Sequence, residues 1–172
     1  MASSPPLPKV QLTALFRAQL EADGADPDYL ADYFAEWKRG WPRFEDLDYY
    51  FGKDGDYHTP KRNNKSVLRH VHMPPEDPKH WPTWAPPLSP EEAAKVKGEL
   101  EEWDKRWGQR RAARFRTSSR VLVYVDGGRH GYLLLHLARE PDGHDEATAN
   151  NHLMEMWADV ADAFIHDGTV AV

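Results

Sequence analysis

The sequence predicts one α+β domain in which an antiparallel sheet carries helices against one face. The segments 120–125 and 131–138 are rich in apolar residues, and an Asp-Gly-Gly-Arg turn at 126–129 separates them as in a β-hairpin. Before and after this hairpin, at 26–40 and from 142 onward, apolar residues recur at the 3.6-residue spacing of amphipathic helices. Strands grouped in this way beside helices indicate the α+β class.

The residue pattern at the N-terminal end of the sequence predicts a strand followed by a helix. The apolar segment 10–20 fits either element, and we expect a strand through its middle. A helix then begins with Asp26 as its cap and Pro27 in its first position, and Gly40 ends it. Its apolar stripe follows the i, i+3, i+4, i+7 pattern and consists of Leu30, Tyr33, Phe34 and Trp37.

The middle of the chain contains one predicted strand, at 66–73, between two loops. The first loop, 41–60, includes the turn signal Asp54-Gly55, and the second, 74–90, holds seven prolines. Strand alternation places three residues on one face, Val67, Val71 and Met73. It places three others on the opposite face, Leu68, His70 and His72.

Two more helices are predicted further along. A charged helix near 90–107 follows a capping box of Ser89 and Glu92, and its narrow apolar stripe indicates a surface position. The last helix is expected to start at Asp142. Its predicted buried stripe consists of Ala149, Leu153, Met156, Trp157, Val160 and Phe164.

The composition indicates a soluble, cytoplasmic protein with no membrane partner. The 172 residues suit one hydrophobic core, and we expect a disordered tail at 1–8 and a single domain at 9–168. There is no cysteine, which excludes disulfides and thiolate metal sites. The first residues lack the pattern of a signal peptide, and no apolar run approaches the roughly 20 residues that span a bilayer.

Charge is distributed unevenly along the chain. The net charge of −6 argues against a nucleic-acid binder, because phosphate contacts depend on lysine and arginine. However, the acid-free stretch 105–120 contains Lys105, Arg106, Arg110, Arg111, Arg114, Arg116 and Arg120. A second basic run, at 61–69, contains Lys61, Arg62, Lys65 and Arg69. An arginine cluster of this kind can hold phosphates, but a solvated linker that pairs with the preceding acidic helix explains it equally well.

Histidine and tyrosine are the candidate proton-transfer groups. His70 and His72 point to the same face of their strand, where two imidazoles could exchange protons or simply lie at the surface. A polar cleft would form if Tyr124, in a neighbouring strand, faced the same side. His136 is expected on the face of its strand that carries Leu134.

A metal site is a weaker hypothesis. The side chains with suitable donor atoms are Asp54, Asp56, His58, His70, His72, His144 and Asp145. Their spacing matches no established metal motif, so a metal-dependent nuclease ranks third among the functional hypotheses.

Several blocks of the sequence resemble the YafO family of toxin–antitoxin mRNA interferases. They are residues 34–40, 51–54, 57, 67–73, 115–124, 132–134, 141–144 and 150–151, followed by the closing helix. The blocks occur in the family's order within residues 10–166. Two features depart from the family pattern: the segment 75–108 looks like an insertion, and Ser119 stands where the pattern often has aspartate.

The resemblance implies a RelE-like fold and an endoribonuclease toxin that cuts translated mRNA at the ribosome and is restrained by a cognate antitoxin. It implies no cofactor and no metal. The substrate's own 2′-hydroxyl attacks the adjacent phosphate, so the protein supplies a base, an acid and cationic stabilisation of the phosphorane.

From side-chain chemistry and predicted facing, we assign roles within this reaction. The catalytic residues are predicted to be His70, His72, Arg116 and Tyr124. The RNA-binding residues are predicted to be Lys65, Arg69, Arg110, Arg111, Arg114 and Arg120. The alternative hypothesis, which the acidic net charge favours, is a non-enzymatic protein-binding module that docks through the helix near 90–107 and exposed tryptophans.

Overall fold

The computed structural model describes residues 6–39, 51, 54–73, 120–139 and 150–170. Within these residues a five-stranded sheet has the order β1-β7-β6-β5-β2. Its strands are β1 (Val10–Leu12), β2 (Asp54–Asp56), β5 (Arg69–His72), β6 (Val121–Asp126) and β7 (Tyr132–Ala138). The short strands β3 (Lys61–Arg62) and β4 (Lys65–Ser66) form a separate hairpin.

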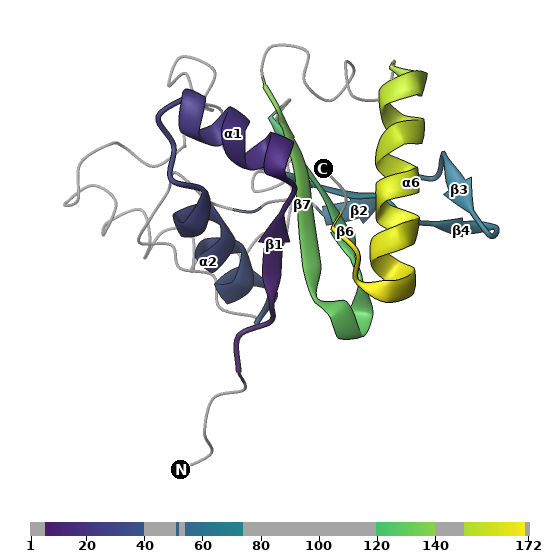
Figure 1. The fold of residues 1–172 in the computed structure, drawn as a ribbon, viewed down its shortest axis with the longest axis horizontal. Coiled ribbons are helices and arrows are strands. Elements are labelled where there is room, and N and C mark those ends of the chain that lie inside the picture. Colours follow the sequence, from purple (N-terminus) through teal and green to yellow (C-terminus); the bar gives the residue numbers. More distant parts are fainter. Residues whose placement is uncertain (1–5, 40–50, 52–53, 74–119, 140–149, 171–172) are drawn as a thin grey trace, which may run out of the picture.

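The α+β class is confirmed, but the sheet is mixed. β1 runs parallel to β7, whereas the other neighbouring strands are antiparallel. Helices cover both faces rather than one (Figure 1): α1 (Ala14–Ala22) and α2 (Pro27–Lys38) lie on one face, and α6 (Asn151–Asp167) lies on the other. The central strand β6 requires this arrangement, because its residues 121–125 are all fully buried and need cover on both sides.

Two hydrophobic cores therefore flank the sheet. The core on the α6 side includes Val121, Val123 and Val125 together with Trp157 and Phe164 of the helix. The core on the α2 side includes Leu122, Tyr124, Leu134, Phe16 and Phe34. Residues from β6 alternate between the two cores, as the alternation of side chains along a strand requires.

The first elements differ partly from the prediction. The expected strand through 10–20 is confined to β1, and a helix begins directly after it. Thr13 caps this helix by accepting a hydrogen bond from the backbone N–H of Phe16 at 3.3 Å. Phe16 and Leu20, four residues apart, then share the buried face of α1. The predicted start of α2 is confirmed, since Asp26 caps it and Pro27 is its first residue.

The middle strands also differ from expectation. Asp54 and Gly55, expected in a turn, belong to the edge strand β2, which pairs with β5. Pairing with another strand has here overridden the local turn preference of Asp-Gly. The expected alternation fails at Val67, which packs with Leu68 in the core on the α6 side because regular strand geometry begins only at Arg69.

The last helix is confirmed, and its predicted buried stripe is confirmed in part: Trp157 and Phe164 are buried, and Leu153 and Val160 pack, partly buried, against the same core. In the described residues Asn150 caps it, accepting from the backbone N–H of Leu153 at 3.0 Å. Its buried residues are Met154, Trp157, Ala158, Ala161 and Phe164. Met156, predicted to be buried, is 43% exposed. The two alanines form the side that meets the sheet, where small residues allow close approach of the helix.

Several predicted features lie outside the described residues. They are most of the tail at 1–8, the charged helix near 90–107 with the rest of the insertion 75–108, and the start of the last helix at Asp142. The RelE-like topology also stays a prediction.

Gly131 is expected to be one of the least replaceable glycines. It has a φ of +84°, and a Cβ at this position would lie 2.2 Å from the backbone oxygen of Lys9, which leads into β1. Gly131→Ala would therefore combine left-handed strain with displacement of β1, and should lower the free energy of unfolding by more than about 2 kcal/mol.

Gly24 provides the matched control for this substitution. Its φ is +76°, but no described atom lies within 4 Å of where a Cβ would be, so Gly24→Ala tests strain alone and should cost about 1–2 kcal/mol. Urea unfolding measures both variants. Equal losses would show that the contact with Lys9 does not constrain β1.

Candidate functional site

Three polar side chains from three elements meet around the buried hydroxyl of Tyr124. Tyr124 of β6 donates a hydrogen bond to Asp54 Oδ1 at 2.7 Å. Its oxygen accepts from Lys38 Nζ at 2.6 Å and from Arg69 Nε at 2.9 Å. A phenol has one donor and two acceptor positions, so these contacts use all of them. Tyr124 is fully buried and therefore acts on its neighbours, not on a molecule from solvent.

Two carboxylates balance the two cations of this cluster. Asp54 Oδ2 accepts from Lys38 at 3.2 Å and from Arg69 Nη2 at 3.1 Å. Asp56 Oδ1 accepts from Arg69 Nη1 at 2.6 Å. The side chains become more exposed from Lys38 (13%) through Arg69 (30%) to Asp56 (46%). A molecule approaching from solvent would meet Arg69 and Asp56 before Lys38.

The register of the sheet assembles the cluster. Arg69 lies opposite Tyr124 on one side and opposite Asp56 on the other, so the three residues form a row across β6, β5 and β2. Asp54 lies two residues from Asp56 and shares its face. Lys38 reaches the row from the last residue of α2. We name these five side chains, Lys38, Asp54, Asp56, Arg69 and Tyr124, the charged cluster.

Aromatic rings surround the ammonium group of Lys38. Nζ lies 4.1 Å from the ring centroid of Trp37, 4.5 Å from that of Tyr124 and 5.3 Å from that of Tyr132. Ring faces attract a cation at this range. Burial nevertheless lowers the pKa of Lys38, although Asp54 opposes the shift.

The pKa values of Tyr124 and Arg69 are both raised, which keeps the phenol neutral and the guanidinium charged. Burial raises the pKa of Tyr124, and its hydrogen bond to Asp54 raises it further. For Arg69, burial lowers the pKa, but the bonds to Tyr124 and Asp54 outweigh this and raise it overall. Of the two cations in the charged cluster, Lys38 is therefore the one whose pKa is lowered.

The predicted catalytic residues do not all converge. Tyr124 is in the charged cluster, on the α2 side of the sheet. His70 and His72 face the α6 side, opposite Val123 and Val121 of that core. A polar cleft would have required Tyr124 to face the same side as the two histidines. The cleft does not form, because the register of the strands puts Tyr124 and the histidines on opposite faces of the sheet. His72 is only 7% exposed, and its ring centroid lies 5.4 Å from that of His70.

The remaining predicted residues are dispersed or lie outside the described residues. Arg69, predicted to bind RNA, belongs to the charged cluster. Lys65 is exposed in β4, and Arg120 is partly buried just before β6. The other predicted arginines lie outside the described residues and are Arg110, Arg111, Arg114 and Arg116.

A β-bulge explains why His136 is not where alternation places it. The register shifts between Val123 and Tyr124, which pair with His136 and Leu134. The extra residue in β7 turns His136 toward α6, with its ring centroid 5.0 Å from that of Trp157.

The metal hypothesis finds no cluster in the part of the chain that the structure describes. No group of three His, Asp or Glu side chains there has a metal-binding arrangement. Asp54 and Asp56, two of its proposed ligands, instead bind Arg69.

Sequence reasoning missed Lys38 as a site residue and considered Asp54 and Asp56 only as possible metal ligands. Lys38 reads as the polar end of an amphipathic helix, and the two aspartates read as turn residues. The signal that could have found them was their position, because Lys38 and Asp54 lie in blocks that resemble the YafO family.

The comparison with known families decides the identity of this chain. A family model described as toxin YafO of type II toxin–antitoxin systems matches residues 35–166. The chain belongs to the YafO toxin family. The match covers every residue of the charged cluster, and no curated protein and no solved structure matches the chain.

Membership gives this YafO-family protein a toxin role and a cognate antitoxin as partner. None of the described helices has the length and apolar character needed to cross a membrane.

Proposed function

We propose that this YafO-family toxin is an endoribonuclease that cleaves mRNA at the ribosome, in the cytoplasm, and thereby blocks translation. The substrate's 2′-hydroxyl attacks the adjacent phosphate without a metal ion. The charged cluster is the reaction centre. The observation that carries this proposal is the pairing of a partly exposed arginine with a desolvated lysine on one buried phenol.

Arg69 is the phosphate-binding group in this proposal. Its guanidinium is held by Tyr124, Asp54 and Asp56, which fixes the plane of its N–H donors. A phosphate competes with the two carboxylates for these donors, and arginine binds phosphate oxygens in pairs. The same donors stabilise the additional charge of the phosphorane.

Lys38 is the proton acceptor. Its neutral form takes the 2′-hydroxyl proton as the 2′-oxygen bonds to phosphorus and the bond from phosphorus to the 5′-oxygen breaks. Water protonates the departing 5′-oxygen. Tyr124 is a positioning residue, because its hydroxyl is saturated by Lys38, Arg69 and Asp54 and is shielded from solvent.

The other assigned residues stay predictions within this function. Arg116 is proposed as a second cation at the phosphate, and His70 and His72 as proton-transfer groups. Because the histidines face away from the charged cluster, alanine at either should reduce cleavage less than alanine at Arg69. Contacts with RNA are further proposed for Lys65, Arg110, Arg111, Arg114 and Arg120.

Brief induction of the toxin, followed by mapping of RNA 5′ ends, tests the function. We expect growth arrest that the antitoxin reverses, new 5′ ends within coding regions, and loss of those ends when translation is blocked. Cleavage by purified toxin and ribosomes should continue in excess chelator and leave 2′,3′-cyclic phosphates. Growth arrest with intact RNA would instead identify a protein-binding module.

The pH dependence of cleavage tests the role of Lys38. The rate should rise with pH, because the neutral amine becomes more abundant as pH passes through a pKa that lies below the ordinary lysine value. Lys38→Arg, which stays charged, should lower the rate about 100-fold and flatten this rise.

Lys61→Arg is the control for that measurement, since Lys61 is an exposed lysine of β3 outside the charged cluster. It should leave both rate and profile unchanged. An unaltered pH profile in Lys38→Arg would remove Lys38 as the base.

A further inference from the structure

A second site lies on the α6 side of the sheet and shares only Asp56 with the charged cluster. It is a pocket of about 370 Å³ between the β2–β3 segment and the first turns of α6. The residues that define its chemistry are Asp56, Tyr57, His58, His70, Asn151 and Glu155. The volume falls in the lower range of small-molecule sites.

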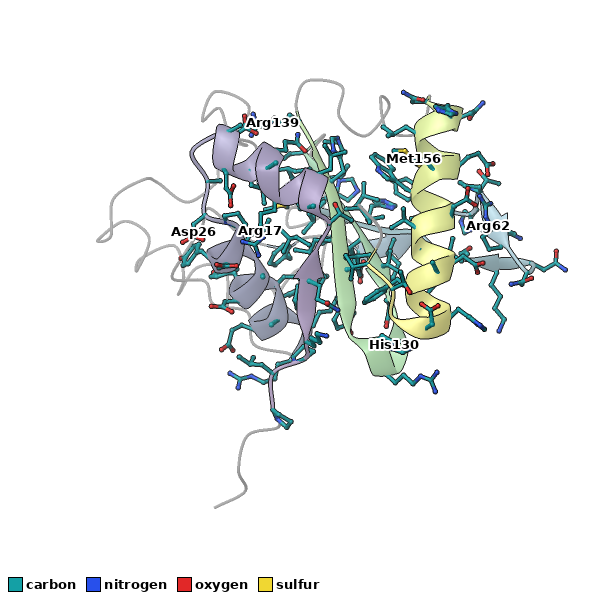
Figure 2. All side chains as sticks on the ribbon, in the orientation of Figure 1. Arg17, Asp26, Arg62, His130, Arg139 and Met156 are labelled. Carbon is teal, nitrogen blue, oxygen red and sulfur yellow. The ribbon has the colours of Figure 1, made fainter. Side chains whose placement is uncertain are left out.

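The pocket presents one carboxylate whose charge is already balanced. Glu155 binds Arg62 at 2.8 Å. Arg62 lies beside α6 at the β3–β4 hairpin (Figure 2). Among the described residues that line the pocket there is no lysine or arginine, so it is unsuited to a phosphate. Because the Glu155 carboxylate already has a cationic partner, an uncharged ligand with N–H donors fits better than a second cation.

The walls of the pocket provide flat rings and an amide. The rings of Tyr57 and His70 lie 4.4 Å apart at an angle of 32°. Asn151 is exposed at the first position of α6, one turn before Glu155. Aromatic and imidazole rings that stack, together with amide and carboxylate groups that hydrogen-bond base edges, are the means by which proteins bind unstacked RNA bases.

We propose that this pocket binds one nucleobase of the substrate and selects bases that carry an exocyclic amino group. The N–H groups of that amino group donate hydrogen bonds to the side-chain oxygens of Glu155 and Asn151, which orient the base. The inference rests on the proposed ribonuclease function. Asp56 connects the two sites, because its carboxylate binds Arg69 while the residue also lines the pocket. RNA that crosses the β2 edge can thus place a phosphate at Arg69 and a nearby base in the pocket.

Nucleoside binding tests the pocket without requiring cleavage. Cytidine and uridine are titrated into the purified full chain, and the ring signals of His58 and His70 are followed by NMR. The amino-bearing cytidine should bind about tenfold more tightly than uridine. Guanosine should likewise bind more tightly than inosine, which lacks the 2-amino group.

Glu155→Met removes the acceptor and should abolish the preference for cytidine. Asp159→Leu is the matched control, since Asp159 also binds Arg62, at 2.7 Å, but does not line the pocket. The same two variants are compared for base preference at mapped cut sites. Only Glu155→Met should reduce cleavage at preferred sites relative to other sites, by about tenfold.

The outcomes separate this inference from the proposed function. Nucleoside binding that depends on Glu155, in a chain that cuts no RNA, supports the pocket and overturns the nuclease. RNA cleavage with the same base preference in Glu155→Met overturns the pocket and leaves the nuclease. Argininamide that binds in the pocket more tightly than every nucleoside also overturns the inference, because the site would then suit a cationic side chain of a protein partner.

Discussion

Replacing Arg69 by lysine is expected to abolish toxicity and slow RNA cleavage by about 10²–10³-fold. The guanidinium makes three directed contacts, through Nε to Tyr124, Nη1 to Asp56 and Nη2 to Asp54. An ammonium group keeps the charge but cannot reproduce this planar set of donors. The loss should therefore fall on cleavage more than on RNA affinity, because the fixed geometry matters most when charge develops on phosphorus.

Arg62→Lys is a closely matched control. Arg62 also binds two carboxylates, those of Glu155 and Asp159, and its side chain is 20% exposed compared with 30% for Arg69. It lies at the β3–β4 hairpin, on the far side from the charged cluster. Lysine at this position should leave cleavage within about twofold, because it keeps a positive charge beside Glu155 and Asp159 and contacts no member of the charged cluster.

Thermal unfolding distinguishes a catalytic loss from a folding defect in these variants. Both should melt within a few degrees of the unaltered chain, because lysine retains a charge beside the carboxylates. Equal loss of cleavage in the two variants, or full cleavage in Arg69→Lys, would remove the charged cluster as the reaction centre.

Local patterns predicted α2, α6, β6 and β7 because the causes of these elements are local. The cap at Asp26, the proline after it and the stripe through Phe34 define α2 within one short segment. The hairpin of β6 and β7 follows similarly from two apolar runs and a glycine-rich turn. These features depend on neighbours in the sequence, so the sequence alone was sufficient.

The candidate site depends on long-range register and could not be predicted in the same way. Asp54 becomes a site residue only because β2 pairs with β5, and Arg69 meets Tyr124 only because β5 pairs with β6 at one particular register. A shift of one residue would exchange Arg69 for His70 at this position. The bulge in β7 likewise reverses His136, which no alternation pattern indicates.

These long-range contacts also couple the α2-side core to the charged cluster. Phe34 is fully buried, and its ring centroid lies 5.0 Å from that of Tyr124 and 5.3 Å from that of Trp37. Both of those rings contact the ammonium group of Lys38. Phe34 therefore supports the walls that desolvate Lys38 and fix the phenol.

Phe34→Ala is expected to lower the free energy of unfolding by about 3–5 kcal/mol, which is the usual cost of emptying a buried phenylalanine site. Phe16→Ala should cost about the same, because Phe16 is 1% exposed in the same core. Urea unfolding measures both. A loss below about 1 kcal/mol for Phe34→Ala would show that the aromatic packing around it is not tight.

Leucine variants then separate the contribution of Phe34 to stability from its effect on Lys38. Leucine keeps most of the side-chain volume, so each variant should lose less than about 1.5 kcal/mol of unfolding free energy. Phe34→Leu should lower cleavage about tenfold, since a smaller side chain admits water beside Lys38 and loosens Tyr124. Phe16→Leu should leave cleavage unchanged, as Phe16 packs in the same core from α1. Equal cleavage by these two folded variants would mean that the aromatic walls stabilise the domain without tuning the lysine.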